Sequence, residues 1–168
     1  MQPYIVSRTK YGNPFDIRIH ARRGAEGKFK LIPYPRIGGN PEGVLSNISA
    51  GGHTMPIEKF LINEFGKDWQ IIDDMLTQLG KILPDYVQSV VDTTLASMGI
   101  DVGIQRRGNS YELKIFEVNL ASPGVSAIRI EAAFADLEYC RYLGRQLAEK
   151  ENMSTAQLSS NAVESKKS

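Results

Sequence analysis

The sequence has little of what several common classes of protein require. Its single cysteine, Cys140, permits no disulfide within the chain, which fits a reducing compartment. One cysteine and two histidines, His20 and His53, are too few for a zinc centre built from those side chains. The formal net charge of +1 gives no support for general binding to nucleic acid or to a membrane surface. No apolar run approaches the length of a transmembrane helix.

Apolar residues alternate with polar ones in some segments and follow helical spacing in others. The pattern predicts strands at 3–8, 15–23 and 29–34, followed by a small-residue loop at 36–52. A helix is then expected from Pro56, with breaks at Gly66 and Pro84, and another at 85–98. Two more strands and a closing helix at 128–149 complete the order. This order of strands and helices indicates an α+β fold with an antiparallel sheet. Large apolar groups are few beyond Lys150, so we expect residues 150–168 to form a disordered tail.

Two short apolar segments carry oxygen-bearing side chains in an unusual place. Residues 99–104 and 116–119 each resemble a buried strand, and a turn joins them. A carboxylate in an apolar strand is costly unless it is paired or bound to a cation. Asp101 lies in the first strand, and Glu117 and Asn119 point to one face of the second. Such oxygen ligands suit Mg²⁺ with a bound phosphate, so the pair predicts a nucleotide–magnesium site; a hydrogen-bonded polar network is the alternative.

Two arginines have both a structural and a functional interpretation. Arg18 follows Asp16 by two residues in a predicted strand, and a salt bridge on a solvent-facing edge strand is the structural interpretation. In the functional interpretation, the planar fork of donors on Arg18 binds a phosphate or an acyl-phosphate. Arg36, just before the small-residue loop, is open to the same two interpretations.

The loop from Ser46 to Gly52 consists almost entirely of small residues. Its backbone N–H groups can approach a phosphate or a substrate carboxylate closely, because glycines leave room. It lacks the Gly-Lys-Ser/Thr ending of a Walker A loop. An ordinary surface loop is the alternative.

The order of these motifs resembles the C-terminal half of an ATP-grasp enzyme over roughly residues 2–148. The motifs are Gln2-Pro3-Tyr4-Ile5, Asp16-Ile17-Arg18, Arg36, Ser46-Asn47 with Gly51-Gly52, Gly99-Ile100-Asp101 and Glu117-Val118-Asn119. The helical stretch between Gly52 and Gly99 and the ending Tyr139-Cys140-Arg141-Tyr142-Leu143 are most similar to the YheC/YheD family, described as endospore coat-associated ATP-grasp proteins. The resemblance implies an ATP-grasp C-terminal domain over residues 1–149, with an antiparallel sheet flanked by helices.

The resemblance also implies roles for individual residues. Asp101, Glu117 and Asn119 match the Mg²⁺ (or Mn²⁺) ligands of the superfamily. Arg18 matches the arginine near the transferred phosphate, and Arg36 is expected to act with it as a catalytic residue. The residues expected to bind ATP are Gln2, Tyr4 and Ile5 in the hinge that meets adenine, and Asn47, Gly51 and Gly52 in the segment that closes over the phosphates.

The implied function is that of the ATP- and Mg²⁺-binding portion of a carboxylate–amine ligase that acts through an acyl-phosphate. The implied partners are ATP and an unidentified carboxylate and nucleophile, without nucleic acid or membrane, in the cytoplasm or associated with the spore coat. The N-terminal domain and the lid, which supply phosphate-binding lysines in the superfamily, are not recognisable, so we expect this chain alone to be inactive unless an N-terminal half completes it. A non-catalytic structural or interaction module, such as a spore-coat component, is the alternative.

Overall fold

The structure is a computed structural model that describes residues 5–43, 46, 51–120, 123–125 and 127–164, with residues 156–164 described by their backbone alone. Its elements are β1 (Phe15–Arg23), η1 (Ala25–Gly27), β2 (Phe29–Ile37), α1 (Ile57–Phe65), η3 (Gly66–Asp68), α2 (Trp69–Ser89), β3 (Ser97–Arg107), β4 (Ser110–Asn119) and α3 (Arg129–Glu164). Here η denotes a short 3-10 helix. The result is an α+β fold, as the sequence predicts.

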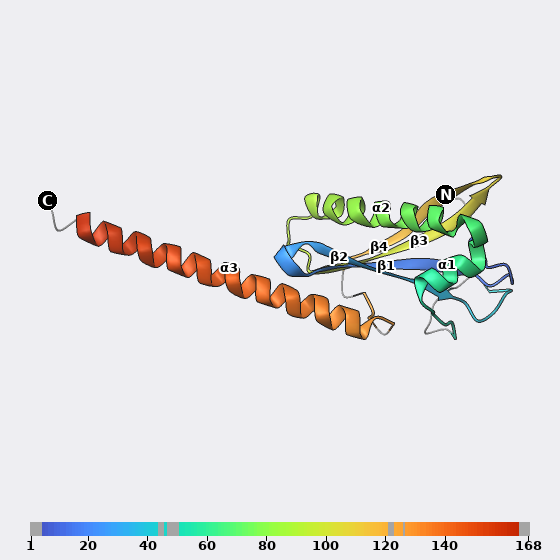
Figure 1. The fold of residues 1–168 in the computed structure, drawn as a ribbon, viewed down its shortest axis with the longest axis horizontal. Helices are drawn as coiled ribbons and strands as arrows, with labels where there is room; N and C mark the ends of the chain where they lie inside the picture. Colours follow the sequence, from blue (N-terminus) through green and yellow to red (C-terminus); the bar gives the residue numbers. More distant parts are fainter. Residues whose placement is uncertain (1–4, 44–45, 47–50, 121–122, 126, 165–168) are drawn as a thin grey trace.

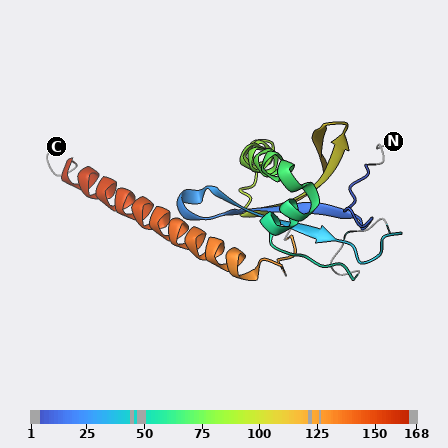
Figure 2. The same cartoon turned by 45° about the vertical axis from the view of Figure 1, so that its right-hand side comes forward.

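The four strands form one antiparallel sheet in the order β2-β1-β3-β4. Helices α1 and α2 cover one face of this sheet, and α3 begins on the other face (Figure 1 and Figure 2). We call the face opposite α1 and α2 the polar face, because it bears Arg18 of β1 and Asp101 of β3. β1 and β3 are the two central strands, so their side chains on both faces are flanked by neighbouring strands.

The face toward α1 and α2 holds the main apolar core. Ile17, Ile19, Ile100 and Val102 alternate along β1 and β3 and are at most 1% exposed. They pack with Phe60 of α1 and with the inward side of α2. Fully burying each such side chain stabilises the fold by about 2 kcal/mol relative to leaving it in water. The period of two then turns the intervening residues of the same strands toward the polar face.

Helix α2 differs from the sequence expectation at Pro84. A break there and a separate helix at 85–98 are predicted, but α2 runs through Pro84 and ends at Ser89. A proline inside a helix crowds the carbonyl four residues before it, which here belongs to Gly80. Gly80 and Pro84 are both buried, and a Cβ at Gly80 would lie 2.7 Å from a methyl carbon of Leu31 on β2. Close packing on the sheet therefore keeps the helix continuous through the proline.

The N-terminal segment also differs from the expectation. A strand is predicted at 3–8, but its described residues form only an isolated bridge, between Arg8 and Pro14. Ser7 instead inserts beside the sheet: its carbonyl accepts a hydrogen bond from Phe15, and its hydroxyl accepts one from the backbone of Ile104. The segment therefore lies beside the sheet without becoming a fifth strand of the described part.

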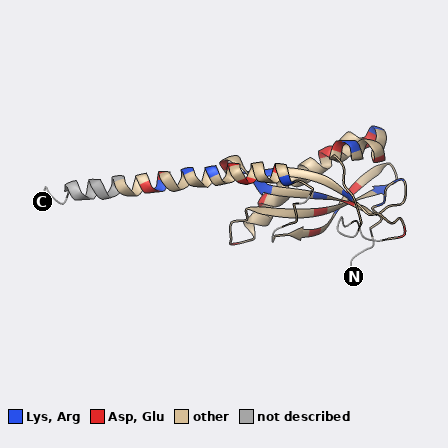
Figure 3. Ribbon diagram, turned by 90° about the horizontal axis from the view of Figure 1, so that it is seen from below, with Lys and Arg blue, Asp and Glu red and all other residues tan. Residues whose placement is uncertain are grey.

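The closing helix is longer than predicted. α3 continues past Lys150 to Glu164, where the sequence predicts a disordered tail. A helix satisfies its backbone hydrogen bonds internally, so this geometry requires no apolar partner. Its second half projects away from the sheet (Figure 1), and basic and acidic residues are interspersed along the part of α3 that Figure 3 colours. Within the described ranges, no helix combines the length and the apolar composition needed to cross a membrane.

Candidate functional site

Asp101 and Glu117 face each other across β3 and β4. They are direct partners in the antiparallel register, so their side chains share the polar face, as the sequence predicts. Asn119, two residues further along β4, lies opposite Gly99 on the same face. Asp101 is 4% exposed, whereas Glu117 is exposed and Asn119 is partly buried. The register therefore brings the three predicted metal-binding residues to one region of the sheet.

Both predicted catalytic arginines also reach this region. Arg18 is the partner of Asp101 on β1, and its Nε and Nη2 each donate a 2.6 Å hydrogen bond to that carboxylate. Arg36 of β2 donates in the same bidentate way to Asp16, at 2.7 and 2.5 Å, and its Nη2 lies 2.8 Å from Oδ2 of Asp101. We call these four side chains the charged network. Each is between 6% and 13% exposed.

The charged network corrects the structural interpretation of Arg18. β1 is a central strand rather than an edge strand, so Asp16 and Arg18 do not lie on a solvent-facing edge. Each forms its ion pair with a different neighbouring strand, Asp16 with Arg36 and Arg18 with Asp101. Three strands are thereby cross-linked at one point on the polar face.

The network keeps its charges although it is largely buried. Burial alone raises the pKa of the Asp101 carboxyl, but the hydrogen bonds from Arg18 and the charge of Arg36 outweigh it and hold this pKa below its ordinary value. Burial likewise lowers the pKa of the Arg36 guanidinium, but Asp16 and Asp101 outweigh it, so that pKa is raised. Asp101 is therefore an anion and Arg36 a cation at neutral pH.

A neutral histidine lies beside the network. His20, two residues after Arg18, is 0% exposed, and its Nε2 is 3.4 Å from the hydroxyl oxygen of Tyr34. Burial, together with the positive charges of Arg18 and Arg22, lowers the pKa of His20 to about 4. The start of α3 packs against Tyr34 and covers this end of the polar face. His20 therefore adds no positive charge to the site at pH 7.

Sequence reasoning missed how four residues, Gly99, Gly103, Phe116 and Pro123, are arranged around Asp101. Gly99 and Gly103 flank Asp101 at a spacing of two, so neither places a side chain against the carboxylate. Pro123 lies over Gly99, and the ring of Phe116 lies over Gly103, where any side chain would collide with it. The register shifts between Asp101 and Val102, which makes Phe116 the extra residue of a β-bulge, 38% exposed. The spacing Gly-x-Asp-x-Gly is the sequence signal for this arrangement.

The described ends of the small-residue loop both return to the charged network. The hydroxyl of Ser46 donates a 2.7 Å hydrogen bond to Asp16. At the other end, His53 and Ile37 exchange two backbone hydrogen bonds of 2.9 Å, next to Arg36 in the chain. Gly51 and Gly52 come directly before His53 and therefore lie near the end of β2.

The remaining predicted site residues are the hinge residues and Asn47, and the structure describes only one of them, Ile5. Ile5 lies two residues before Ser7, which is hydrogen-bonded to Ile104, three residues past Asp101 on β3. Gln2, Tyr4 and Asn47 lie outside the described residues.

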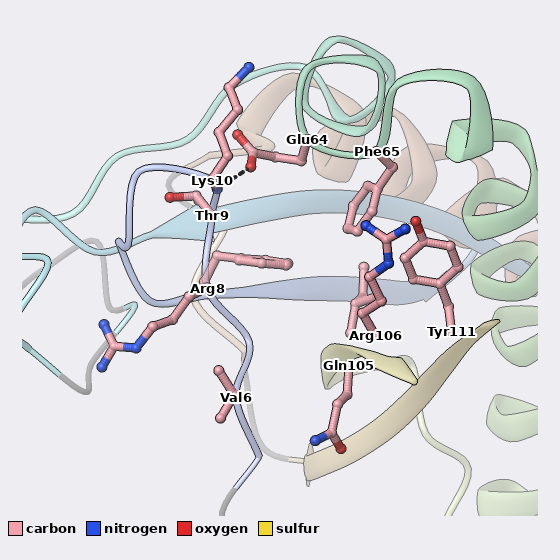
Figure 4. A pocket seen from close by; sticks show the side chains of 11 residues that line it. Val6, Arg8, Thr9, Lys10, Glu64, Phe65, Gln105, Arg106 and Tyr111 are labelled. Carbon is pink, nitrogen blue, oxygen red and sulfur yellow. Dashed lines mark hydrogen bonds between the residues drawn. The ribbon is translucent and has the colours of Figure 1, made fainter. Parts of the chain in front are cut away.

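A separate cavity of about 380 Å³ lies between the N-terminal segment, the end of α1 and the β3–β4 hairpin (Figure 4). Phe15, Phe65 and Ile104 contribute its apolar lining, and no described residue of the predicted site borders it. Several of its polar groups already have partners: Arg8 donates to the carbonyls of Gly12, Pro41 and Gly43, Glu64 accepts from the backbone of Lys10, and the Tyr111 hydroxyl donates to Asp68. The cavity is therefore distinct from the polar face.

The polar face offers the donor chemistry of a magnesium site. Two carboxylates and an amide are hard oxygen donors, which suit Mg²⁺ and Mn²⁺. In the described part of the chain, no three His, Cys, Asp or Glu side chains gather as a metal-binding group, so Asn119 would be needed as the third protein ligand. The oxygens of Asp101 accept three hydrogen bonds from arginines, out of about four lone-pair positions. A metal at Asp101 must therefore compete with Arg18 or Arg36.

Comparison with known proteins defines the class as ATP-grasp. A family model described as YheC/D-like ATP-grasp matches residues 1–143. Since this match covers most of the chain, the protein belongs to the YheC/D-like ATP-grasp family, and its α+β fold with a four-stranded antiparallel sheet agrees with that membership. At the family level, membership supports nucleotide binding and a ligase-type function. Searches among curated proteins and among solved structures find no match.

Proposed function

We propose that the polar face binds Mg–ATP and serves an ATP-dependent ligase of the YheC/YheD type. The observation that supports this most is the direct pairing of Asp101 with Glu117 on one side and with Arg18 on the other. Oxygen ligands for a cation and a guanidinium for a phosphate thereby lie on adjacent strands of one face. The family match supports the same class of ligand.

The chain's own residues then have distinct tasks. Glu117 is exposed and directly opposite Asp101, so its carboxylate is available to share a cation with that residue, and Asn119 contributes an amide oxygen beside it. Bound Mg²⁺ would neutralise phosphate charge and polarise the transferred phosphoryl group. Arg18 and Arg36 present guanidinium forks that match phosphate geometry. Asp16 holds Arg36 by two hydrogen bonds, which orients the second guanidinium before a ligand arrives.

Phe116 provides a surface for the base of the nucleotide. Its ring is partly exposed on the polar face and comes directly before Glu117 in the chain. An aromatic ring accepts the face of a base by stacking, without demanding hydrogen bonds to it. We propose that the hinge residues Gln2, Tyr4 and Ile5 meet the edge of the base, and that Asn47, Gly51 and Gly52 close over the phosphates.

The proposed reaction has two steps. A substrate carboxylate oxygen attacks the γ-phosphorus, the bond from that phosphorus to the bridging oxygen breaks, and ADP leaves with that electron pair. An amine or another nucleophile then attacks the acyl carbon, and inorganic phosphate leaves as the nucleophile gives up a proton. The residues of the polar face hold the phosphates and their charge in place for the first step.

Charge balance implies that the described chain binds ATP weakly by itself. A triphosphate carries about four negative charges at neutral pH, whereas Arg18 and Arg36 are the cations held in the charged network. Glu117 is exposed to water, which weakens each charge interaction at the site. We therefore propose that further cations come from a segment outside the described residues.

Titration calorimetry with Mg–ATP, followed by an ADP-release assay with panels of carboxylates and amines, tests the proposal. We expect weak Mg–ATP binding that disappears in Glu117→Gln, and no turnover from this chain alone. Adding an N-terminal half, fused or separate, should strengthen binding. Mg–ATP affinity that is unchanged by Glu117→Gln would contradict the assignment of the polar face. Micromolar binding with turnover from the isolated chain would refute the need for a second half.

One observation favours a non-catalytic module instead. Two arginines already occupy three of the roughly four lone-pair positions of Asp101, as expected of a network that only holds three strands together. In that case the wild type, Arg18→Gln and Glu117→Gln would all show no measurable affinity for metal or nucleotide. Pull-down of spore-coat proteins with the wild-type chain would then be the next experiment.

A further inference from the structure

Gly99 occupies a position on the polar face where the space, rather than the backbone, requires glycine. It lies in the middle of a row across the sheet, between His20 on β1 and Asn119 on β4. Its φ is not among the positive values that disfavour other residues. Every other described strand residue in this row carries a side chain over the polar face, so Gly99 leaves a gap between them.

Pro123 fills that gap. A Cβ on Gly99 would lie 2.8 Å from Cβ of Pro123, closer than packed carbons allow, and 3.5 Å from its Cγ. It would lie in ordinary contact with Nε of Arg18, at 3.7 Å, so Pro123 is the neighbour that must move. Pro123 is buried, and its ring cannot rotate away as a flexible side chain would.

This contact places Pro123 beside Asn119. β4 ends at Asn119, and only three residues separate Asn119 from Pro123. Asn119 is the direct partner of Gly99 in the antiparallel register, so a ring seated on Gly99 lies next to the Asn119 side chain on the polar face.

We infer that Gly99 is a positioning residue for the metal site, acting through Pro123 on Asn119. This inference rests on the proposed function. A side chain at position 99 displaces Pro123, which lies beside Asn119 on the polar face. The placement of one proposed ligand, Asn119, therefore depends on the absence of one methyl group.

The test is the affinity for Mn²⁺, measured by electron paramagnetic resonance of the free ion on the full chain. Residues that orient metal ligands typically contribute at least tenfold to affinity, so we expect Gly99→Ala to bind Mn²⁺ about tenfold more weakly than the wild type. Pro123→Gly, which removes the contact from the other side, should also weaken binding. The double variant Gly99→Ala with Pro123→Gly adds a methyl group at position 99 and removes the proline ring that it would hit. It should bind Mn²⁺ more tightly than Gly99→Ala alone.

Gly124→Ala is the matched control, because nothing lies within 4 Å of a Cβ at Gly124. It should bind Mn²⁺ as the wild type does. Thermal midpoints without metal separate a loss of stability from a loss of affinity. If Gly99→Ala does not fold, Pro123→Gly decides, and unchanged Mn²⁺ affinity in that variant overturns the inference.

The outcomes distinguish the inference from the proposal beneath it. A wild-type chain that binds no Mn²⁺ contradicts the proposed metal site and the inference with it. A wild-type chain that binds Mn²⁺ while Gly99→Ala binds equally well contradicts the inference alone. A purely structural glycine would lower the thermal midpoint of Gly99→Ala and leave its Mn²⁺ affinity unchanged.

Discussion

Arg18 donates two hydrogen bonds of 2.6 Å to Asp101, the residue directly opposite it on the adjacent strand. In the proposed function these two residues have different ligands, a phosphate for Arg18 and a cation for Asp101. Arg18 therefore occupies the carboxylate that a cation needs, and Asp101 occupies the guanidinium that a phosphate needs. A cation that draws Asp101 away frees Arg18 for an anion, so the two ligands should favour each other's binding.

Removing Arg18 should strengthen the binding of a metal alone. In Arg18→Gln, Asp101 loses two of its three hydrogen bonds, so we expect Mn²⁺ affinity to rise by about tenfold, or about 1.4 kcal/mol, while Mg–ATP affinity falls. The variant should also lose about 3 kcal/mol of stability, because a buried charge is left partly unpaired. Calorimetry with each ligand measures the two affinities.

Arg22→Gln is the control for that prediction. Arg22 lies on the same strand and face but pairs with Asp136, so its loss removes a positive charge without freeing Asp101. An equal rise of Mn²⁺ affinity in both variants would mean that general electrostatics, rather than release of Asp101, sets the effect.

Glu117 should determine whether a metal stabilises the fold. A ligand that binds only the native state adds about 2.7 kcal/mol to the free energy of unfolding at a concentration 100 times its dissociation constant. We expect millimolar Mg²⁺ or Mn²⁺ to raise the thermal midpoint of the wild type and of Glu112→Gln, but not of Glu117→Gln. Glu112 is a fair comparison, since it lies on the same strand in a half-exposed ion pair with Arg107 and Lys114. A wild-type thermal midpoint that neither Mg²⁺ nor Mn²⁺ changes would count against a metal site.

Phe116 should contribute to nucleotide affinity and not to metal affinity. Stacking of a base on an aromatic side chain is worth about 1–3 kcal/mol, so Phe116→Ala should weaken Mg–ATP binding by that amount. Ile115→Ala serves as the comparison, because Ile115 is similarly exposed, at 41% against 38%, but pairs with Val102 on the other face. Similar losses in both variants would show that the hairpin's packing, not stacking, is responsible. Calorimetry with Mg–ATP and with Mn²⁺ alone separates the two ligands.

His20 should make stability depend on pH in mildly acidic solution. Its pKa is lowered from 6.5 to about 4 in the folded protein, so between these values the unfolded chain binds a proton that native His20 does not. The free energy of unfolding is therefore fully retained above pH 6.5 and falls as the pH drops toward 4, by up to about 3 kcal/mol. Urea unfolding at stepped pH measures the slope, and His20→Gln should flatten it. If His20→Gln shows the same slope, a group other than His20 takes up the proton on unfolding.

The projecting half of α3 should be dispensable. The contacts of this helix with the body come from its first half, where Asp136 pairs with Arg22 and Tyr142 lies against Gly27. A chain ending at Lys150 should therefore keep the thermal midpoint and the Mn²⁺ affinity of the full chain. Limited proteolysis should cut between Lys150 and Glu164 first. Protection of that segment would show that it docks on a surface.

Local pattern alone was enough to predict some of this fold. The strand at 15–23 follows from alternation, and the hairpin that carries Asp101 and Glu117 follows from two apolar segments joined by a turn. The break after Phe65 follows from Gly66, which takes a φ of 55° that few other residues adopt. Pro84 was misjudged because the compensating Gly80 acts through its packing on Leu31, a contact between distant parts of the chain.

The sequence by itself determined which side chains could form a site, because period-two spacing places Asp16 with Arg18, and Glu117 with Asn119, on shared faces whatever the sheet order. Only the tertiary structure decided their partners. With β1 between β2 and β3, Asp16 pairs with Arg36 and Arg18 with Asp101, although 83 residues separate the last two. Strand order and register are set by burial of the whole apolar face, an energy summed over the sheet that no single segment contains.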